Sequence, residues 1–131
     1  LFAEAFDAAD SYASAPPTDA YLRRLLALDH VVALAVIDAG GVAGGLVAYE
    51  LVKFEQERSE FYIYDLAVAG THRRRGIAGA LIDRLREIAA GRGGSVVFVQ
   101  ADHGDEPAIA LYSRFGTRED VLHFDIPVDR G

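Results

Sequence analysis

The 131-residue chain contains no cysteine, no methionine and no tryptophan, and it has one lysine against twelve arginines. Without cysteine, disulfides, thiolate metal ligands and cysteine nucleophiles are all excluded. Long hydrophobic runs are also missing, since the longest one, Val31 to Ile37, is far shorter than the roughly 20 residues of a membrane-spanning helix. No basic-then-apolar leader begins the sequence. We therefore expect a cytoplasmic protein that does not bind a membrane.

Negative charge dominates the chain. Twenty acidic residues against thirteen basic ones give a net charge of −7. This sign is wrong for a protein that neutralises nucleic-acid phosphates, and it favours a cationic partner. A net negative surface also simply keeps a protein in solution, which is the plainer interpretation. Arg73, Arg74 and Arg75 form a basic block within this acidic chain and predict an anion-binding turn.

The length and the hydrophobic fraction of 51% fit one globular domain spanning residues 1–131. Apolar periodicity and turn signals predict the order of the elements. They are the end of a helix at Leu1–Phe6, a helix from Pro16 with an apolar stripe from Tyr21 to Leu28, strands at His30–Ile37 and Val42–Leu51 joined by a hairpin turn at Asp38–Gly41, a strand at Glu60–Val68, a helix at Gly76–Ala90, a strand at Ser95–Gln100, a helix at Ala108–Phe115 and a strand at Val121–Val128. This order predicts an α/β fold with one mixed sheet and helices on both faces.

The stretch from Asp65 to Ala78 runs from a strand, through the basic block, into a helix. The amino-terminus of a helix presents unpaired N–H groups and a partial positive charge. Glycine at position 76 would let an anion approach that backbone closely, and arginines just before it would add charge-assisted hydrogen bonds. The alternative is a solvated basic turn that precedes an ordinary helix.

Two motifs resemble those of a known superfamily. Arg73-x-x-Gly76-x-Ala78 directly after a strand resembles the pyrophosphate arm of the GNAT acetyltransferases, whose pattern is Gln/Arg-x-x-Gly-x-Gly/Ala. The stretch from Asp105 to Gly116 is similar to their Asn-x-x-Ala-x-x-Leu-Tyr-x-x-x-Gly helix, with aspartate in place of the asparagine. Residues 53–60, 62–68, 99–102 and 123–126 resemble the type I aminoglycoside 3-N-acetyltransferases more closely. The chain begins too late to contain the superfamily's amino-terminal strand, so we expect the first strand of the family to be missing.

The resemblance implies acetyl-CoA as the acetyl donor. In the family the two central strands splay apart and free backbone N–H groups for the donor, and these strands match Tyr62–Val68 and Ser95–Gln100 here. The positions implied for the cofactor arm are the main chain of Leu66, Ala67 and Val68, and those for the pyrophosphate are Arg73, Arg74, Arg75, Gly76, Ile77 and Ala78. We expect no metal, because the four histidines lack the spacing of metal ligands.

The resemblance also implies the acceptor, a gentamicin-like 2-deoxystreptamine aminoglycoside acetylated on its 3-amino group, with antibiotic resistance as the result. Asp65 interrupts an apolar strand, which is unfavourable unless its carboxylate meets water or a cation. It is therefore predicted either as the base or as the group that orients the ammonium while water takes the proton. Tyr112 resembles the family's general acid for the CoA thiolate. Substrate ammonium groups would be held by Asp65, Asp102, Asp105 and Glu106.

Each assignment has an alternative. Asp65 would otherwise be a strand-end carboxylate bound by backbone donors, and Tyr112 a tyrosine that packs on the sheet. The acidic loop at 102–106 would otherwise be a solvated helix cap. For the whole chain, the alternatives are a GNAT enzyme that acetylates polyamines or protein amines, and a non-catalytic acyl-CoA-binding domain. Acetyltransferases of this type are often homodimers, so a homodimer is an open expectation.

Overall fold

The computed structural model describes residues 17–72 and 76–130. The helix end predicted at Leu1–Phe6 and the basic block at 73–75 therefore lie outside the described residues. The chain divides into two compact units, Leu1–Gln100 and Ala101–Gly131. The single domain over residues 1–131 remains a prediction.

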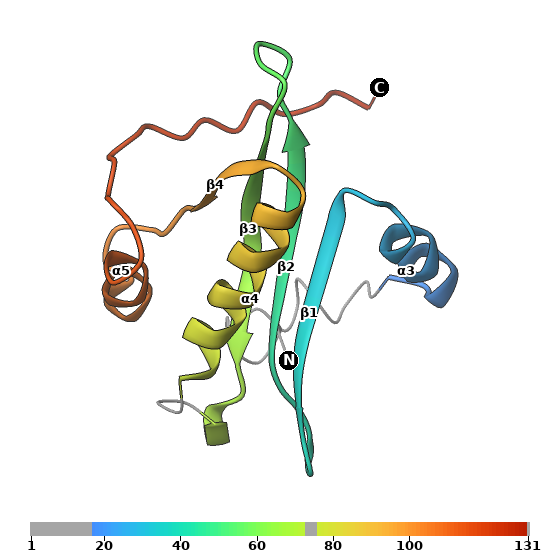
Figure 1. The fold of residues 1–131 in the computed structure, drawn as a ribbon, viewed down its shortest axis with the longest axis vertical. Coiled ribbons are helices and arrows are strands. Elements are labelled where there is room, and N and C mark those ends of the chain that lie inside the picture. Colours follow the sequence, from blue (N-terminus) through green and yellow to red (C-terminus); the bar gives the residue numbers. More distant parts are fainter. Residues whose placement is uncertain (1–16, 73–75, 131) are drawn as a thin grey trace. The chain divides into compact units, whose positions relative to one another are not determined.

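The first unit contains one four-stranded sheet in the order β1-β2-β3-β4 (Figure 1). Its strands are β1 (Val31–Asp38), β2 (Gly41–Val52), β3 (Ser59–Val68) and β4 (Gly94–Val99). The first three strands are antiparallel neighbours, whereas β4 runs parallel to β3. The four strands predicted for this part of the chain and their mixed sheet are thereby confirmed. The sheet begins at Val31 in the described part of the chain.

The predicted hairpin turn between β1 and β2 is also confirmed. Asp38 pairs with Gly41, so Ala39 and Gly40 form the turn. Gly41 has a φ of 121°, which lies in the region that only glycine adopts readily. The Asp38 carboxylate accepts a hydrogen bond from the Ala39 N–H at 2.8 Å, which stabilises the turn from within.

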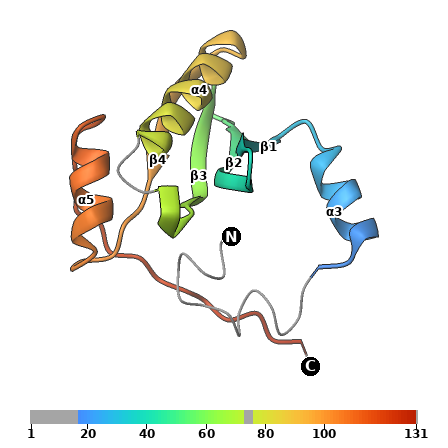
Figure 2. The same ribbon diagram turned by 90° about the horizontal axis from the view of Figure 1, so that it is seen from below.

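Helix α4 (Ile77–Gly91) covers one face of the sheet (Figure 2). Leu81, Ile82, Leu85 and Ala89 form its buried stripe, at the spacing that a helix needs to present one apolar face. Leu85 packs in a core with Leu46 and Phe61, and all three side chains are fully buried. Burying a side chain of this size stabilises the fold by roughly 1.5–3 kcal/mol. The helix ends at Gly91, one residue beyond the predicted Ala90; Arg92 is its C-cap residue, and Gly93 supplies the positive φ that often follows a helix terminus.

Helix α3 (Asp19–Leu26) begins at the end of the stretch from Pro16 to Asp19 that predicts its start. The Thr18 hydroxyl accepts a hydrogen bond from the Tyr21 N–H at 3.1 Å and caps the helix. The predicted apolar stripe is present, but its Tyr21, Leu22, Leu26 and Leu28 are exposed.

The second unit contains helix α5 (Glu106–Ser113), which confirms the last predicted helix two residues earlier than expected. The strand predicted at Val121–Val128 is wrong, because residues 117–130 form neither helix nor strand. Alternating apolar residues make a strand only when a neighbouring strand completes the hydrogen bonds. The described residues of this unit contain no strand that could do so.

Gly94 allows β4 to lie under the end of α4. A Cβ atom at this position would be 2.9 Å from Cε1 of the buried Phe61 and 3.0 Å from the carbonyl oxygen of Ala89. We predict that Gly94→Ala lowers the free energy of unfolding by about 1–3 kcal/mol through overpacking. Urea denaturation measures this loss. Gly40→Ala is the control, because nothing lies within 4 Å of a Cβ atom there. Equal midpoints for the two variants would contradict the prediction.

Candidate active site

Strands β3 and β4 part halfway along β3. Their parallel pairing begins at Ser59 and ends with Ile63 opposite Val99. β3 then continues to Val68, paired with β2 on its other edge. Among the described residues, no strand pairs with the β4-side edge of β3 beyond Ile63. Backbone groups along that edge, in the segment that includes Leu66, Ala67 and Val68, are thus placed to bind an extended ligand as another strand would.

The start of α4 lies beside this half of β3 because Gly44 has no side chain. A Cβ atom on Gly44 would lie 2.7 Å from Cγ2 of Ile77 and 3.4 Å from the carbonyl oxygen of Ala67. The first turn of the helix therefore packs directly on β2 and β3. Two of the positions predicted for the cofactor, Ala67 and Ile77, are brought together in this way.

The amino-terminus of α4 has the features of an anion site. Gly76 is its N-cap residue, with a φ of 76°, and makes no side-chain cap. The first turn carries no acidic residue, so its N–H groups present their partial positive charge unopposed there. Nothing in the described structure lies within 4 Å of a Cβ atom placed on Gly76, so a side chain at this position would enter open space. The roles predicted for Arg73, Arg74 and Arg75 stay predictions.

The connection between β3 and α4 is fastened to the β1–β2 hairpin. It contains the short helix η1 (Gly70–His72). Ala69 N–H donates to the carbonyl oxygen of Ala43 at 2.8 Å, and His72 Nε2 lies 2.9 Å from Oδ2 of Asp38. From the sequence, His72 is considered only as a metal ligand and is expected not to be one, so no feature of the sequence indicated this contact with Asp38.

Asp65 lies at a β-bulge. Val47 of β2 pairs with Asp65, but the next residue, Ala48, pairs with Ile63, so Tyr64 is an extra residue in β3. Ile63 is buried on the face that α4 covers, and regular alternation would place Asp65 on that face too. The bulge instead moves the half-buried Asp65 to the opposite face. There, after burial itself, its charge contributes most to raising the pKa of Tyr49.

The other predicted site residues belong to the second unit. Asp105 caps α5 by accepting a hydrogen bond from Ala108 N–H at 3.3 Å, as the alternative for this loop expects. Tyr112 lies two turns further along the helix and is half-buried. Burial and the negative charge of Asp105 raise the pKa of Tyr112, so its phenol stays protonated near neutral pH. Asp102 and Glu106 are exposed beside the cap.

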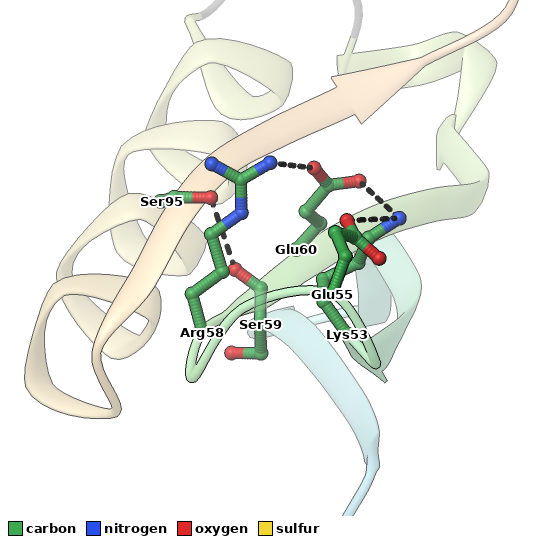
Figure 3. A network of polar contacts seen from close by, with 6 residues as sticks. All are labelled: Lys53, Glu55, Arg58, Ser59, Glu60 and Ser95. Carbon is green, nitrogen blue, oxygen red and sulfur yellow. Dashed lines mark hydrogen bonds and ion pairs between the residues drawn. The ribbon is translucent and has the colours of Figure 1, made fainter.

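A separate polar network occupies the β2–β3 turn, at the far end of β3 from Val68 (Figure 3). Lys53 lies 3.5 Å from Glu55 and 3.8 Å from Glu60, and Arg58 lies 3.4 Å from Glu60. The Ser95 hydroxyl donates to the Ser59 carbonyl oxygen at 3.2 Å and ties β4 to the base of the turn. Residues 53–60, which carry part of the resemblance to the 3-N-acetyltransferases, thus form a structural cluster away from the start of α4.

Over residues 17–72 and 76–130, no cluster of three or more histidine, aspartate or glutamate side chains is arranged to hold a metal ion. None of the helices described is long and apolar enough to cross a membrane.

Several solved structures share this fold. An aminoglycoside acetyltransferase from an uncultured soil metagenomic sample is 62% identical, with a TM-score of 0.94, over 98% of this chain and 86% of its own. A second soil metagenomic aminoglycoside acetyltransferase, in complex with sisomicin, is 28% identical, with a TM-score of 0.87 over the same shares. A ribosomal-protein-alanine N-acetyltransferase from Brucella melitensis biovar Abortus 2308 is 26% identical, with a TM-score of 0.73, over 98% of this chain and 85% of its own.

No curated protein matches the chain. Residues 2–117 match the sequence pattern of the acetyltransferase (GNAT) family. This range includes both motifs, the parted strands and helix α4. Together with the 62% identity to a solved acetyltransferase, this match shows that the chain belongs to the GNAT family of acetyltransferases.

Proposed function

We propose that the protein transfers an acetyl group from acetyl-CoA to the 3-amino group of a gentamicin-like 2-deoxystreptamine aminoglycoside, and thereby gives antibiotic resistance. The observation that carries the chemistry is the open edge of β3 beside the uncapped start of α4. The aminoglycoside class is supported by the two soil acetyltransferases, one of them in complex with sisomicin. The 3-amino position depends on the sequence resemblance alone. A cytoplasmic location and a homodimer remain predictions.

The donor would bind along the first unit. The main chain of Leu66, Ala67 and Val68 would pair with the amide-containing arm of acetyl-CoA. Its pyrophosphate would meet the N–H groups at Gly76, Ile77 and Ala78, with the basic block adding positive charge. A backbone N–H directed at the thioester oxygen would stabilise the negative charge that develops there, typically by about 3 kcal/mol.

The acceptor would attack from the face that carries Asp65. Its amine must be neutral, so Asp65 would take the ammonium proton or orient the amine while water takes that proton. As the nitrogen bonds to the acetyl carbon, the carbon–sulfur bond breaks and a thiolate leaves. Tyr112 would return a proton to this thiolate, and its raised pKa keeps that proton on the phenol until it is needed. Asp102, Asp105 and Glu106 would hold the other ammonium groups.

Acetylation of a protein amino group is the second candidate. It is favoured by the 26% identity to the Brucella enzyme, whose name gives it a ribosomal-protein alanine as acceptor.

A thiol-release assay with acetyl-CoA separates these functions. Gentamicin, spermidine and a peptide with a free amino-terminus serve as acceptors, and we expect release with gentamicin. NMR of the product should show acetylation of the 3-amino group. Acetylation of another amine would refute the regiochemistry, release only with the peptide would favour the second candidate, and acetyl-CoA binding without any release would favour a non-catalytic domain.

Two glycines at opposite ends of α4 give a matched test of the donor site. Gly76 and Gly93 both have a φ of 76°, and nothing lies within 4 Å of a Cβ atom on either. Valine strains the backbone at both positions, but only Gly76→Val fills the space in front of the helix amino-terminus. We predict that Gly76→Val abolishes acetyl-CoA binding in calorimetry, whereas Gly93→Val retains it. Equal affinities of the two folded variants for acetyl-CoA would contradict the assignment of the pyrophosphate to the start of α4.

Removal of the Tyr112 hydroxyl tests proton return. We predict that Tyr112→Phe lowers kcat about 10²-fold or more and leaves the Kd of acetyl-CoA unchanged. Asp105→Asn keeps an N-cap residue but removes the charge that helps raise the pKa of Tyr112. The alkaline loss of activity, which follows phenol ionisation, should therefore begin at a lower pH in Asp105→Asn. Wild-type turnover by Tyr112→Phe would mean that another group protonates the thiolate.

Asp65→Asn tests the acceptor side, since it keeps the size of the side chain but removes its charge and basicity. We predict that it is the most damaging single change at the site, with kcat and acceptor affinity falling together while acetyl-CoA still binds. In the wild-type protein, the KM for gentamicin should rise with salt because charge attraction is screened. A salt-independent KM, or unimpaired turnover by Asp65→Asn, would count against the assignment.

A further inference from the structure

Four aromatic rings form a continuous cluster on the sheet face opposite α4. They come from three strands and are called here the aromatic platform: Tyr49 of β2, Tyr62 and Tyr64 of β3, and Phe98 of β4. The Tyr64 ring meets the rings of Tyr49 and Tyr62 edge to face, with centroids 5.8 and 5.6 Å away. Tyr62 stacks on Phe98 at 4.6 Å. Such contacts hold the rings in fixed orientations.

The platform includes Tyr64 next to Asp65 only because of the bulge. Successive side chains of a regular strand point to opposite faces, which would separate this ring from this carboxylate. Here Asp65 pairs with Val47, which shares its face of β2 with Tyr49, and Tyr64 contacts the Tyr49 ring. The carboxylate and the aromatic ring therefore stand on the same face, one residue apart.

Tyr64 is the accessible member of this group. Its side chain is 64% exposed, whereas Tyr49 and Tyr62 are half-buried around it. Tyr62 is held further by its hydroxyl, which donates to Oε1 of Gln100 at 2.9 Å. The platform also lies at the point where β3 leaves β4, since Tyr62 and Phe98 are partners one step before the pairing ends. A group bound on Tyr64 would be adjacent to the open edge proposed for the donor.

We propose that Tyr64 determines acceptor specificity by binding a protonated amino-sugar ring against its aromatic face, with the adjacent Asp65 attracting the ammonium groups. This inference rests on the proposed function. A cation over a tyrosine ring is attracted by the ring's negative face, and a nearby carboxylate strengthens the preference for positive charge. The net charge of −7 on the whole chain favours the same occupant. An uncharged apolar partner would gain from the ring but would have to desolvate Asp65.

Steady-state kinetics test the contact through the split between KM and kcat. We expect Tyr64→Ala to raise the KM for gentamicin about tenfold, a larger effect than on kcat, with the KM for acetyl-CoA unchanged. Tyr64→Phe keeps the aromatic face and should recover most of the affinity. Phe54→Ala removes a fully exposed ring from the β2–β3 turn and serves as the control. A gentamicin KM that Tyr64→Ala leaves unchanged would overturn the inference.

A binding measurement keeps the test independent of turnover. The chain contains no tryptophan, so Tyr64→Trp introduces a single tryptophan on the platform, and Phe54→Trp places one on the distant turn. Gentamicin should change the emission of Tyr64→Trp with a half-saturation near its KM and leave that of Phe54→Trp unchanged. If neither or both respond while the wild-type chain acetylates gentamicin, the inference alone fails. If the wild-type chain acetylates no aminoglycoside, the proposed function fails.

Discussion

The close approach of α4 to the sheet is the constraint on which the candidate site depends. Gly44 lies under the beginning of the helix and Gly94 under its end, and a side chain at either position would collide with Ile77 or Phe61. Between these two points the fully buried Leu46, Phe61 and Leu85 fill the interface. Because the helix is fixed at both ends, its first turn, which has no side-chain cap, is directed to the half of β3 beyond Ile63, where no strand among the described residues pairs on the β4 side.

At the bulge, neighbouring residues of β3 face opposite sides of the sheet, and two consecutive residues share one side. Ile63 faces α4, whereas Tyr64 and Asp65 both face away from it. The open edge between these faces carries the backbone groups proposed to bind the donor. Donor and acceptor would therefore reach β3 from different directions, one along the edge and one across the face that carries Asp65. That separation would let both be bound before the acetyl group moves.

Local signals in the sequence predicted most of the first unit. The apolar spacing of Leu81 and Leu85 and the turn at Asp38–Gly41 identify α4 and the first hairpin, because helix periodicity and turn chemistry are short-range properties. The order of elements and the glycine at 76 also predicted where α4 begins, whereas the anion site at that helix end stays a prediction. Alternation alone failed at Val121–Val128, since a strand needs a partner that no local pattern can supply.

The bulge at Tyr64 could not be predicted either. It depends on the register between β2 and β3, and a shift of one residue reverses which face a side chain occupies. The sequence therefore indicates Asp65 as unusual and β3 as rich in aromatic residues, without showing that the two features meet. The His72–Asp38 contact is of the same kind, because it joins residues 34 positions apart in the chain.

The cap of α5 has a consequence for how such a protein can evolve. Asp105 occupies the position where the family pattern has asparagine, and either residue can accept the hydrogen bond that Ala108 N–H donates. An exchange between the two therefore alters the charge beside Tyr112 while the helix keeps its first hydrogen bond. Mutational drift at this position can adjust the acidity of a neighbouring phenol with little loss of stability, which gives selection a way to tune the chemistry without rebuilding the fold.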